Sequence, residues 1–199
     1  MDEIKYFYQS ELIKLFKAIE TSKDNYKFWL RDYCIFKTAY VCALRASEVG
    51  LIKVSYFNSQ RGELYCKRLK HSHNNTIRII DIDKKLVNLL KQYIKEYNLS
   101  PDDYLFLSQH KKPISRQTLD KLVKHYCLAA KLSDTSKWHF HTLKHSIAVH
   151  LAEGGLDIKE LQYYLGHKNI ANTLIYFQFT STQQEFMYSK IKISKSIVN

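Results

Sequence analysis

The chain has 199 residues, of which 45% are hydrophobic, so it is long enough to bury one core, and a single domain is the expected organisation. Its 31 lysines and arginines against 19 aspartates and glutamates give a net charge of +12, which favours a polyanionic partner such as DNA, although RNA-binding proteins share this property. No run approaches the roughly 18 apolar residues of a membrane span and no signal peptide is recognisable, so we expect no membrane association and a cytoplasmic, nucleoid-associated location.

The first half of the chain is predicted to form two helices followed by three short strands. One helix opens at Ser10, and a second, long and apolar, spans residues 25–43 and delivers Arg45 at its end. The strands are expected at residues 54–57, 64–69 and 76–82, with turns at 58–62 and 71–75 between them. On its own, Arg45 is also compatible with a helix-end cap.

The second half is predicted to be helical. Helices are expected over residues 84–98, after a capping Ser115, over 140–153 with a stop at Gly154 and Gly155, and around 158–165, followed by an apolar segment at 170–179. The fold class is therefore mainly α with a small three-stranded antiparallel sheet. The helix after Ser115 turns several basic residues outward, as a DNA-binding face or merely a solvated one: Arg116, Lys121, Lys124 and His125.

The four cysteines show no metal-ligand spacing and are expected to be reduced, mostly buried thiols. His141 and His145 stand four apart, a spacing used by zinc sites, but threonine follows His141 where the HExxH motif has glutamate, and no third ligand is evident. Nothing resembles a phosphate-binding P-loop. We expect neither a metal nor another cofactor.

Four residues near the end of the sequence are spaced for chemistry on a phosphate. His141 and Lys144 lie one helical turn apart, so they can hold two oxygens of one phosphate and stabilise a pentacoordinate phosphorus. His167 ends a short helix, and Tyr176 follows nine residues later, so a tight turn can bring both to the same phosphate. Packing in the helix before His167 is sufficient to explain the nearer tyrosines, Tyr163 and Tyr164.

These motifs, in this order, resemble the catalytic domain of the tyrosine recombinases, the phage integrase family, over residues 10–188. The segment CALRASEVGLI is similar to the family's first arginine box, HTLKHS to its His-x-x-Arg pair and LGH to its second histidine. The resemblance implies the fold and the following roles. Arg45 clamps the phosphate with Glu48 as its supporting carboxylate, His141 and His167 are the two histidines, and Tyr176 is the nucleophile.

Two lysines bear on the expected phosphate chemistry. The family's second arginine is Lys144 here, which keeps the charge but loses the planar fork that binds two phosphate oxygens. The family also has a lysine in a hairpin turn that protonates the departing 5′ oxygen. Lys70, at the border of the 71–75 turn, is the expected counterpart, and Lys67 is the alternative.

The activity implied by the resemblance is that of a site-specific DNA recombinase or integrase, which cleaves and rejoins DNA through a 3′-phosphotyrosyl intermediate. The alternatives are a DNA-binding protein whose catalysis is weakened or lost, for which Lys144 is the clue, and a topoisomerase of the related type IB. The implied partners are double-stranded DNA, three further copies of the chain in a tetramer on DNA, and accessory DNA-bending proteins.

The expected domain organisation is one catalytic domain over residues 1–199. Arg45 lies close to the start, so the N-terminal helical domain of larger recombinases is not expected; the chain resembles small single-domain members or is a fragment. Residues 183–199 are expected to pack onto a neighbouring copy, because Phe186, Met187, Ile191 and Ile193 alternate with lysines. Packing within the same chain is the alternative.

Overall fold

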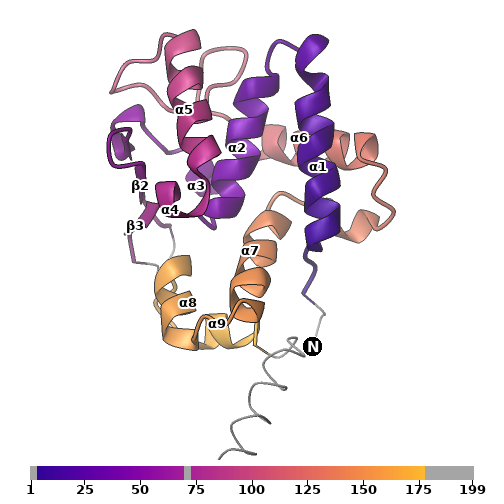
Figure 1. Cartoon of the computed structure of the whole chain (residues 1–199), viewed down its shortest axis with the longest axis vertical. Coiled ribbons are helices and arrows are strands. Elements are labelled where there is room, and N and C mark those ends of the chain that lie inside the picture. The colour runs from indigo at the N-terminus through magenta and orange to yellow at the C-terminus, as the bar shows by residue number, and fades with distance from the viewer. Residues whose placement is uncertain (1–3, 70–72, 178–199) are drawn as a thin grey trace, which may run out of the picture.

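The computed structural model describes residues 4–69 and 73–177 (Figure 1). It confirms the predicted class, because helices dominate and the one described sheet has three antiparallel strands. The α-helices are Gln9–Thr21 (α1), Trp29–Val41 (α2), Ala46–Val49 (α3), Ile79–Ile82 (α4), Lys84–Glu96 (α5), Arg116–Ala129 (α6), Thr142–Glu153 (α7), Ile158–Leu165 (α8) and Ala171–Leu174 (α9). Short 3₁₀ turns are Ser22–Asp24 (η1), Val54–Tyr56 (η2) and Thr135–Lys137 (η3), and the strands are Phe57–Asn58 (β1), Glu63–Cys66 (β2) and Asn75–Arg78 (β3).

Helix α2 is the central element of the fold. It is buried on nearly all sides and packs against α1, α5 and α7 (Figure 1). A large hydrophobic core surrounds it, built from α1, α5, α6 and the sheet. A second, smaller core lies between α7 and α8 and includes Ala43 and Tyr176. The segment after α2 therefore lies where the two cores meet.

Helices α2 and α8 end in the same way. After α2, Ala43 adopts a left-handed conformation (φ 51°), and the amide of Leu44 donates to the carbonyl of Ala39 over 2.9 Å. After α8, Gly166 is left-handed (φ 67°), and the amide of His167 donates to the carbonyl of Gln162 over 3.0 Å. This is the Schellman pattern, which turns the chain sharply. Each turn is followed at once by a predicted site residue, Arg45 or His167.

The sheet is smaller than the sequence predicted. Residues 54–56 form η2 instead of a strand, and β2 ends at Cys66 because the next amides bond to side chains: Arg68 to Asn74 and Leu69 to Glu48. The predicted strand 76–82 is wrong beyond Arg78. There the amide of Ile80 donates to the carbonyl of Gly62, and the chain turns into α4. The helix expected from residue 25 begins at Trp29, after η1.

Other elements follow the predictions closely. Ser115 caps α6, since its hydroxyl accepts from the amide of Thr118 over 3.1 Å. The apolar segment at 170–179 begins with the one-turn helix α9. All four cysteines are free and buried. Residues 183–199 lie outside the described residues. Within the described ranges, no helix has both the length and the apolar character needed to cross a membrane.

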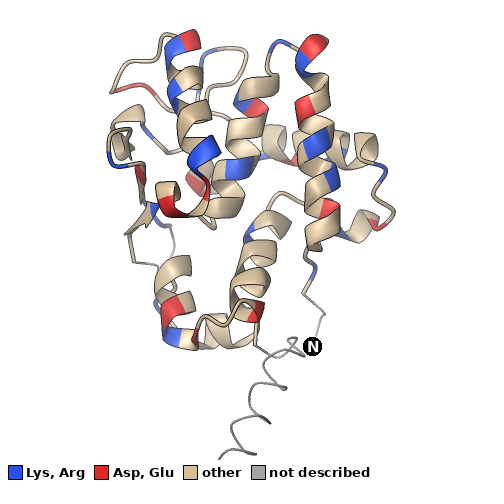
Figure 2. Cartoon of the chain, viewed as in Figure 1, with Lys and Arg blue, Asp and Glu red and all other residues tan. Residues whose placement is uncertain are grey.

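Lysines and arginines occur on all the long helices together with acidic residues, although α5 carries four lysines and only one glutamate (Figure 2). The excess of positive charge is therefore not carried by one element of the fold.

The turn after α8 leaves no room for a side chain at Gly166. A Cβ there would lie 2.7 Å from the carbonyl oxygen of His73, whereas a Cβ at Gly155 (φ 95°) would meet nothing within 4 Å. We expect Gly155→Ala to lower the free energy of unfolding by about 1–2 kcal/mol through backbone strain alone. Gly166→Ala should lower it by roughly 1–3 kcal/mol more, because the His73 backbone must shift. Urea denaturation of both variants tests this; equal losses would show that the clash is relieved without cost.

Candidate active site

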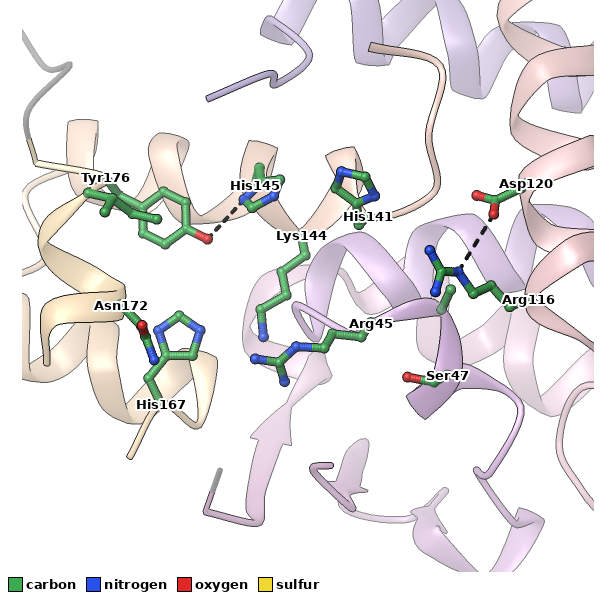
Figure 3. A pocket seen from close by; sticks show the side chains of 12 residues that line it. Arg45, Ser47, Arg116, Asp120, His141, Lys144, His145, His167, Asn172 and Tyr176 are labelled. Carbon is green, nitrogen blue, oxygen red and sulfur yellow. Dashed lines mark hydrogen bonds and ion pairs between the residues drawn. The ribbon is translucent and has the colours of Figure 1, made fainter. Parts of the chain in front are cut away.

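A cavity of about 390 Å³ opens between α3, α6, α7 and the segment that contains α9 (Figure 3). Five of the six predicted catalytic residues line it: Arg45, His141, Lys144, His167 and Tyr176. Lys70 lies outside the described residues, and the alternative, Lys67, is exposed and is not among the lining residues. Residues more than 130 positions apart in the sequence thus meet around one space.

Arg45 is oriented by Glu48 on the next helical turn. Its Nη1 donates to Oε1 of Glu48 over 2.7 Å, and its backbone amide donates to Oε2 over 2.9 Å. The Glu48 side chain is fully buried, whereas that of Arg45 is 31% exposed. Burial raises the pKa of Glu48, but Lys144, the Arg45 amide, Arg68 and the Arg45 side chain together lower it below the ordinary value. Glu48 is therefore ionised. Only Nη1 of the Arg45 guanidinium donates to it, so the other guanidinium nitrogens are available to a ligand.

Lys144 is buried, and its Nζ donates to the carbonyl of Leu165 over 3.2 Å. Burial, together with the positive charges of Arg45 and Arg68, lowers its pKa to about 7. The amine is thus close to half protonated at neutral pH, and an anion in the cavity would favour its charged form.

His167 is a buried, neutral imidazole. Its Nδ1 lies 3.1 Å from the hydroxyl of Thr173, which fixes the ring. Burial and the nearby cations Lys144, Arg45 and Arg68 lower its pKa to about 3. A neutral ring has one N–H donor and one acceptor nitrogen, so His167 can donate to a phosphate oxygen without carrying charge. His141, unlike the buried His167, is exposed; it lies at the N-terminus of α7 and stacks on His139.

Tyr176 is 2% exposed, and its hydroxyl lies 2.9 Å from Nδ1 of His145 (Figure 3). Burial raises the pKa of Tyr176 above 10, and burial and nearby positive charge lower that of His145 to about 4. The phenol therefore donates the hydrogen bond and the neutral imidazole accepts it. Sequence analysis considered His145 only for its spacing from His141 and did not predict this contact, which joins residues 31 positions apart.

The three basic residues predicted to bind DNA divide into two groups. Arg116, at the start of α6, lines the cavity and lies 3.8 Å from Asp120. Lys121 and Lys124 are exposed on α6 and do not line it. No cluster of three or more histidine, cysteine or acidic side chains suited to a metal occurs among residues 4–69 and 73–177.

Comparison with known proteins gives one consistent family. The family model described as the phage integrase family matches residues 5–183. Tyrosine recombinase XerD of Staphylococcus haemolyticus is 31% identical over 185 residues, which cover 90% of this chain and 60% of the relative. A tyrosine recombinase of Pseudothermotoga lettingae is 30% identical over 168 residues, covering 84% of this chain and 55% of the relative. The chain therefore spans at most about 60% of the length of these relatives.

Solved structures share the fold. The XerH site-specific recombinase bound to its palindromic difH substrate in a post-cleavage complex aligns with a TM-score of 0.76 at 23% identity, covering 94% of this chain and 53% of that chain. The catalytic domain of bacteriophage HP1 integrase aligns with a TM-score of 0.65 at 19% identity and covers 92% of both chains.

The lowered pKa of Lys144 predicts a pH-dependent effect on stability. Below pH 7 the amine is charged in both the folded and unfolded chain, and burying that charge destabilises the fold by up to about 5 kcal/mol, since one pKa unit corresponds to about 1.4 kcal/mol. The penalty decreases from pH 7 to about 10.5, where the unfolded amine also becomes neutral. We expect Lys144→Met to be more stable than the wild type at pH 6.5, with the difference vanishing near pH 10.5. Urea denaturation across this range measures it, and a difference that does not vary with pH would contradict the burial of a charged amine.

Proposed function

The chain belongs to the phage integrase family, and on this basis we propose that it carries the catalytic centre of a site-specific DNA recombinase. The observation that supports the proposal most directly is the cavity lined by Arg45, His141, Lys144, His167 and Tyr176.

In the proposed reaction the Tyr176 hydroxyl attacks a phosphorus of the DNA backbone. The new bond joins phosphorus to the tyrosine oxygen, the bond to the 5′ oxygen breaks, and that oxygen leaves as a hydroxyl. A 5′ hydroxyl of a partner strand then attacks the 3′-phosphotyrosyl link and releases Tyr176.

The cavity residues would hold the phosphate during attack. Arg45 keeps donors free beside its bond to Glu48, and Lys144 exchanges the carbonyl of Leu165 for a phosphate oxygen, which keeps its amine protonated. His167 adds a neutral donor. Together they oppose the negative charge that the pentacoordinate phosphorus spreads over its non-bridging oxygens.

The Tyr176 proton leaves as the new bond forms and passes to a non-bridging phosphate oxygen or to solvent water. In the free protein the pKa of Tyr176 lies above 10 and that of His145 is about 4, so transfer to His145 before attack costs more than about 8 kcal/mol at 1.4 kcal/mol per unit. In the free protein His145 therefore holds the phenol and does not remove its proton before attack. The hydroxyl exchanges His145 for the phosphate once DNA is bound. Lys70 as the acid for the 5′ oxygen, with Lys67 as the alternative, remains a prediction.

A second candidate function is DNA binding with weakened or lost catalysis. It is favoured by Lys144, which has a point charge in place of a guanidinium and is already bonded to Leu165. A type IB-like topoisomerase is the third candidate and would cleave without a preferred sequence.

The proposed function also includes an assembly on DNA and a role for each part of the chain. Double-stranded DNA is the substrate, the active assembly is a homotetramer on DNA, and accessory DNA-bending proteins assist it at a nucleoid-associated site in the cytoplasm. Residues 1–199 act as one catalytic domain, Arg116, Lys121 and Lys124 contact DNA, and residues 183–199 pack onto a neighbouring copy.

The decisive experiment uses nicked duplexes with randomised sequence. The short piece released by cleavage, which carries the free 5′ hydroxyl, diffuses away, so the strand cannot be rejoined and the covalent complex accumulates. Wild-type protein should form complexes that resist denaturation, and sequencing of the trapped DNA should return one preferred site. Tyr176→Phe should form none yet bind the recovered duplex with nearly unchanged affinity, because one hydroxyl is lost from a site that retains its cations. Undiminished trapping by Tyr176→Phe would exclude Tyr176 as the nucleophile. Wild-type trapping without sequence preference would favour the topoisomerase.

Variants of Lys144 test the second candidate function. Lys144→Ala should slow trapping by roughly 10²–10³-fold, or about 3–4 kcal/mol, because one donor to the transition state is lost, with little change in DNA affinity. Lys144→Arg should retain or increase activity where the wider guanidinium fits. Rates are compared in single turnover at saturating protein. A wild type that binds but never traps DNA, while Lys144→Arg does, would identify the chain as a binding protein.

A further inference from the structure

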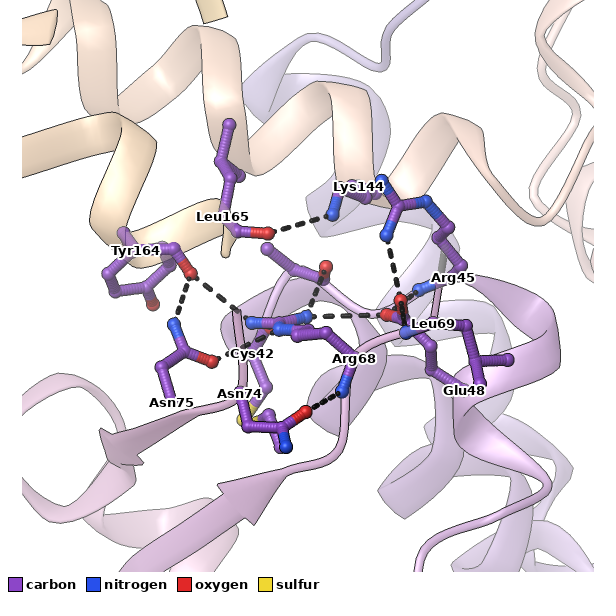
Figure 4. A network of polar contacts seen from close by, with 12 residues as sticks. Cys42, Arg45, Glu48, Arg68, Leu69, Asn74, Asn75, Lys144, Tyr164 and Leu165 are labelled. Atoms are coloured by element: carbon purple, nitrogen blue, oxygen red, sulfur yellow. Dashed lines mark hydrogen bonds and ion pairs between the residues drawn. The ribbon is translucent and has the colours of Figure 1, made fainter. Parts of the chain in front are cut away.

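Arg68 has the most extensively bonded side chain near the cavity, although it is not one of the lining residues (Figure 4). It follows β2, and its side chain is fully buried. Its guanidinium makes five hydrogen bonds. Nε donates to Asn75 over 3.0 Å, Nη1 to the carbonyl of Ala43 over 2.9 Å and to Glu48 over 3.4 Å, and Nη2 to the carbonyls of Cys42 over 2.8 Å and Tyr164 over 3.2 Å.

These bonds connect the two helix ends that precede site residues. Cys42 and Ala43 form the turn after α2 that leads to Arg45, and Tyr164 is in the last turn of α8, three residues before His167. Carbonyls at helix C-termini lack partners within the helix and carry partial negative charge, so a buried cation between two such ends satisfies both. Arg68 thus links the supports of Arg45 and His167 directly.

Arg68 also shares the carboxylate of Glu48 with Arg45. Oε2 of Glu48 accepts from Arg68 and from the Arg45 amide, while Oε1 accepts from the Arg45 guanidinium and from the amide of Leu69 (Figure 4). The orientation of Glu48, and through it that of Arg45, depends on the chain around Arg68.

The turn after α8 is shaped around the same side chain. A Cβ on Gly166 would lie 2.9 Å from Cγ of Arg68, so glycine is needed there for Arg68 to fit. Beside it, the side-chain amide of Asn75 donates to the carbonyls of Tyr163 and Tyr164, and Lys144 donates to that of Leu165. Arg68, Asn75 and Lys144 thus hold the end of α8 in place.

An arginine has five N–H donors, and in Arg68 all five are engaged. None remains for a phosphate, so Arg68 is not a substrate-binding group. We propose that Arg68 is a positioning residue for the proposed DNA cleavage, one that holds Arg45, Lys144 and His167 in fixed relative placement. The inference rests on the proposed function.

Arg31 provides a matched control. It is a buried arginine paired with a buried carboxylate, Asp32, at 2.7 Å, and it donates to the carbonyl of Leu107. It lies in α2 and contacts none of the helix ends that support the cavity. Arg68→Met and Arg31→Met each remove a buried guanidinium, so both should lower the melting temperature.

The two variants are distinguished by their rates of covalent trapping in single turnover. The substrate is a nicked duplex of the sequence that the wild type prefers. At saturating protein, Arg68→Met should trap DNA roughly 10²-fold more slowly than Arg31→Met, because displacement of the phosphate-holding groups by about 1 Å has an effect of this size. Its affinity for the duplex should match that of Arg31→Met. Equal trapping rates for the two variants would overturn the proposal. Where Arg68→Met does not fold, Arg68→Lys, which offers three donors, gives the same comparison.

A second readout does not require DNA. The groups facing the Lys144 amine are Arg45, Arg68, Glu48, Cys66, His145 and His167. Arg68→Met should raise the pKa of Lys144, because it removes the positive charge of Arg68 and leaves the negative charge of Glu48 less neutralised. NMR titration of ¹³C-labelled lysine measures this pKa, and Arg31→Met should leave it unchanged. If the wild type traps no DNA, the proposed function fails and this titration still decides: an unchanged Lys144 pKa in Arg68→Met would overturn the role of Arg68.

Discussion

The buried carboxylate of Glu48 is the interaction on which the cavity depends. Arg45, Arg68 and Lys144 bring positive charge into a region largely shielded from water, where such charges repel one another and lose hydration. Glu48 is bonded to both arginines and its charge acts on Lys144. Burial first, and then the remaining positive charge of the neighbouring cations, lower the pKa values of Lys144 and His167. A phosphate dianion or diester would complete the neutralisation, so the free protein is electrostatically poised for an anion.

Much of the cavity could be predicted from sequence because its residues lie in short local motifs. Arg45 and Glu48 are three apart, His141 and Lys144 are three apart, and His167 follows a glycine that ends a helix. The spacing of His141 and Lys144 reports helical geometry directly, whereas Arg45 and Glu48 were identified by their match to the family's first arginine box. The outward face of α6 was predicted in the same way, but periodicity alone did not reveal that Arg116 faces the cavity while Lys121 and Lys124 do not.

What the sequence did not predict depends on contacts between distant positions. The partners of the Arg68 guanidinium lie 7 to 96 residues away in the sequence. No local pattern around Arg68 indicates that this arginine, which follows a strand, is buried. The strand expected at 76–82 failed for a related reason. A run rich in isoleucine favours a strand through Ile82, but the bond from the amide of Ile80 to the carbonyl of Gly62 ends the ladder, and the chain forms a turn of helix there. Patterning identifies which residues are apolar, whereas the partners of the backbone decide where an element stops.

The contact between Tyr176 and His145 has a consequence for fidelity. A basic protein meets vastly more non-target phosphates than target ones, and non-specific complexes form through charge alone. In the proposed reaction, the Tyr176 hydroxyl, buried and bonded to His145, would not be presented as a nucleophile to these encounters. Part of the binding energy gained at a target site would then be used to release the hydroxyl, which would lower apparent affinity but confine the chemistry to that site. Discrimination between DNA sequences would then operate at the exposure of one oxygen atom, after binding and before any bond is broken.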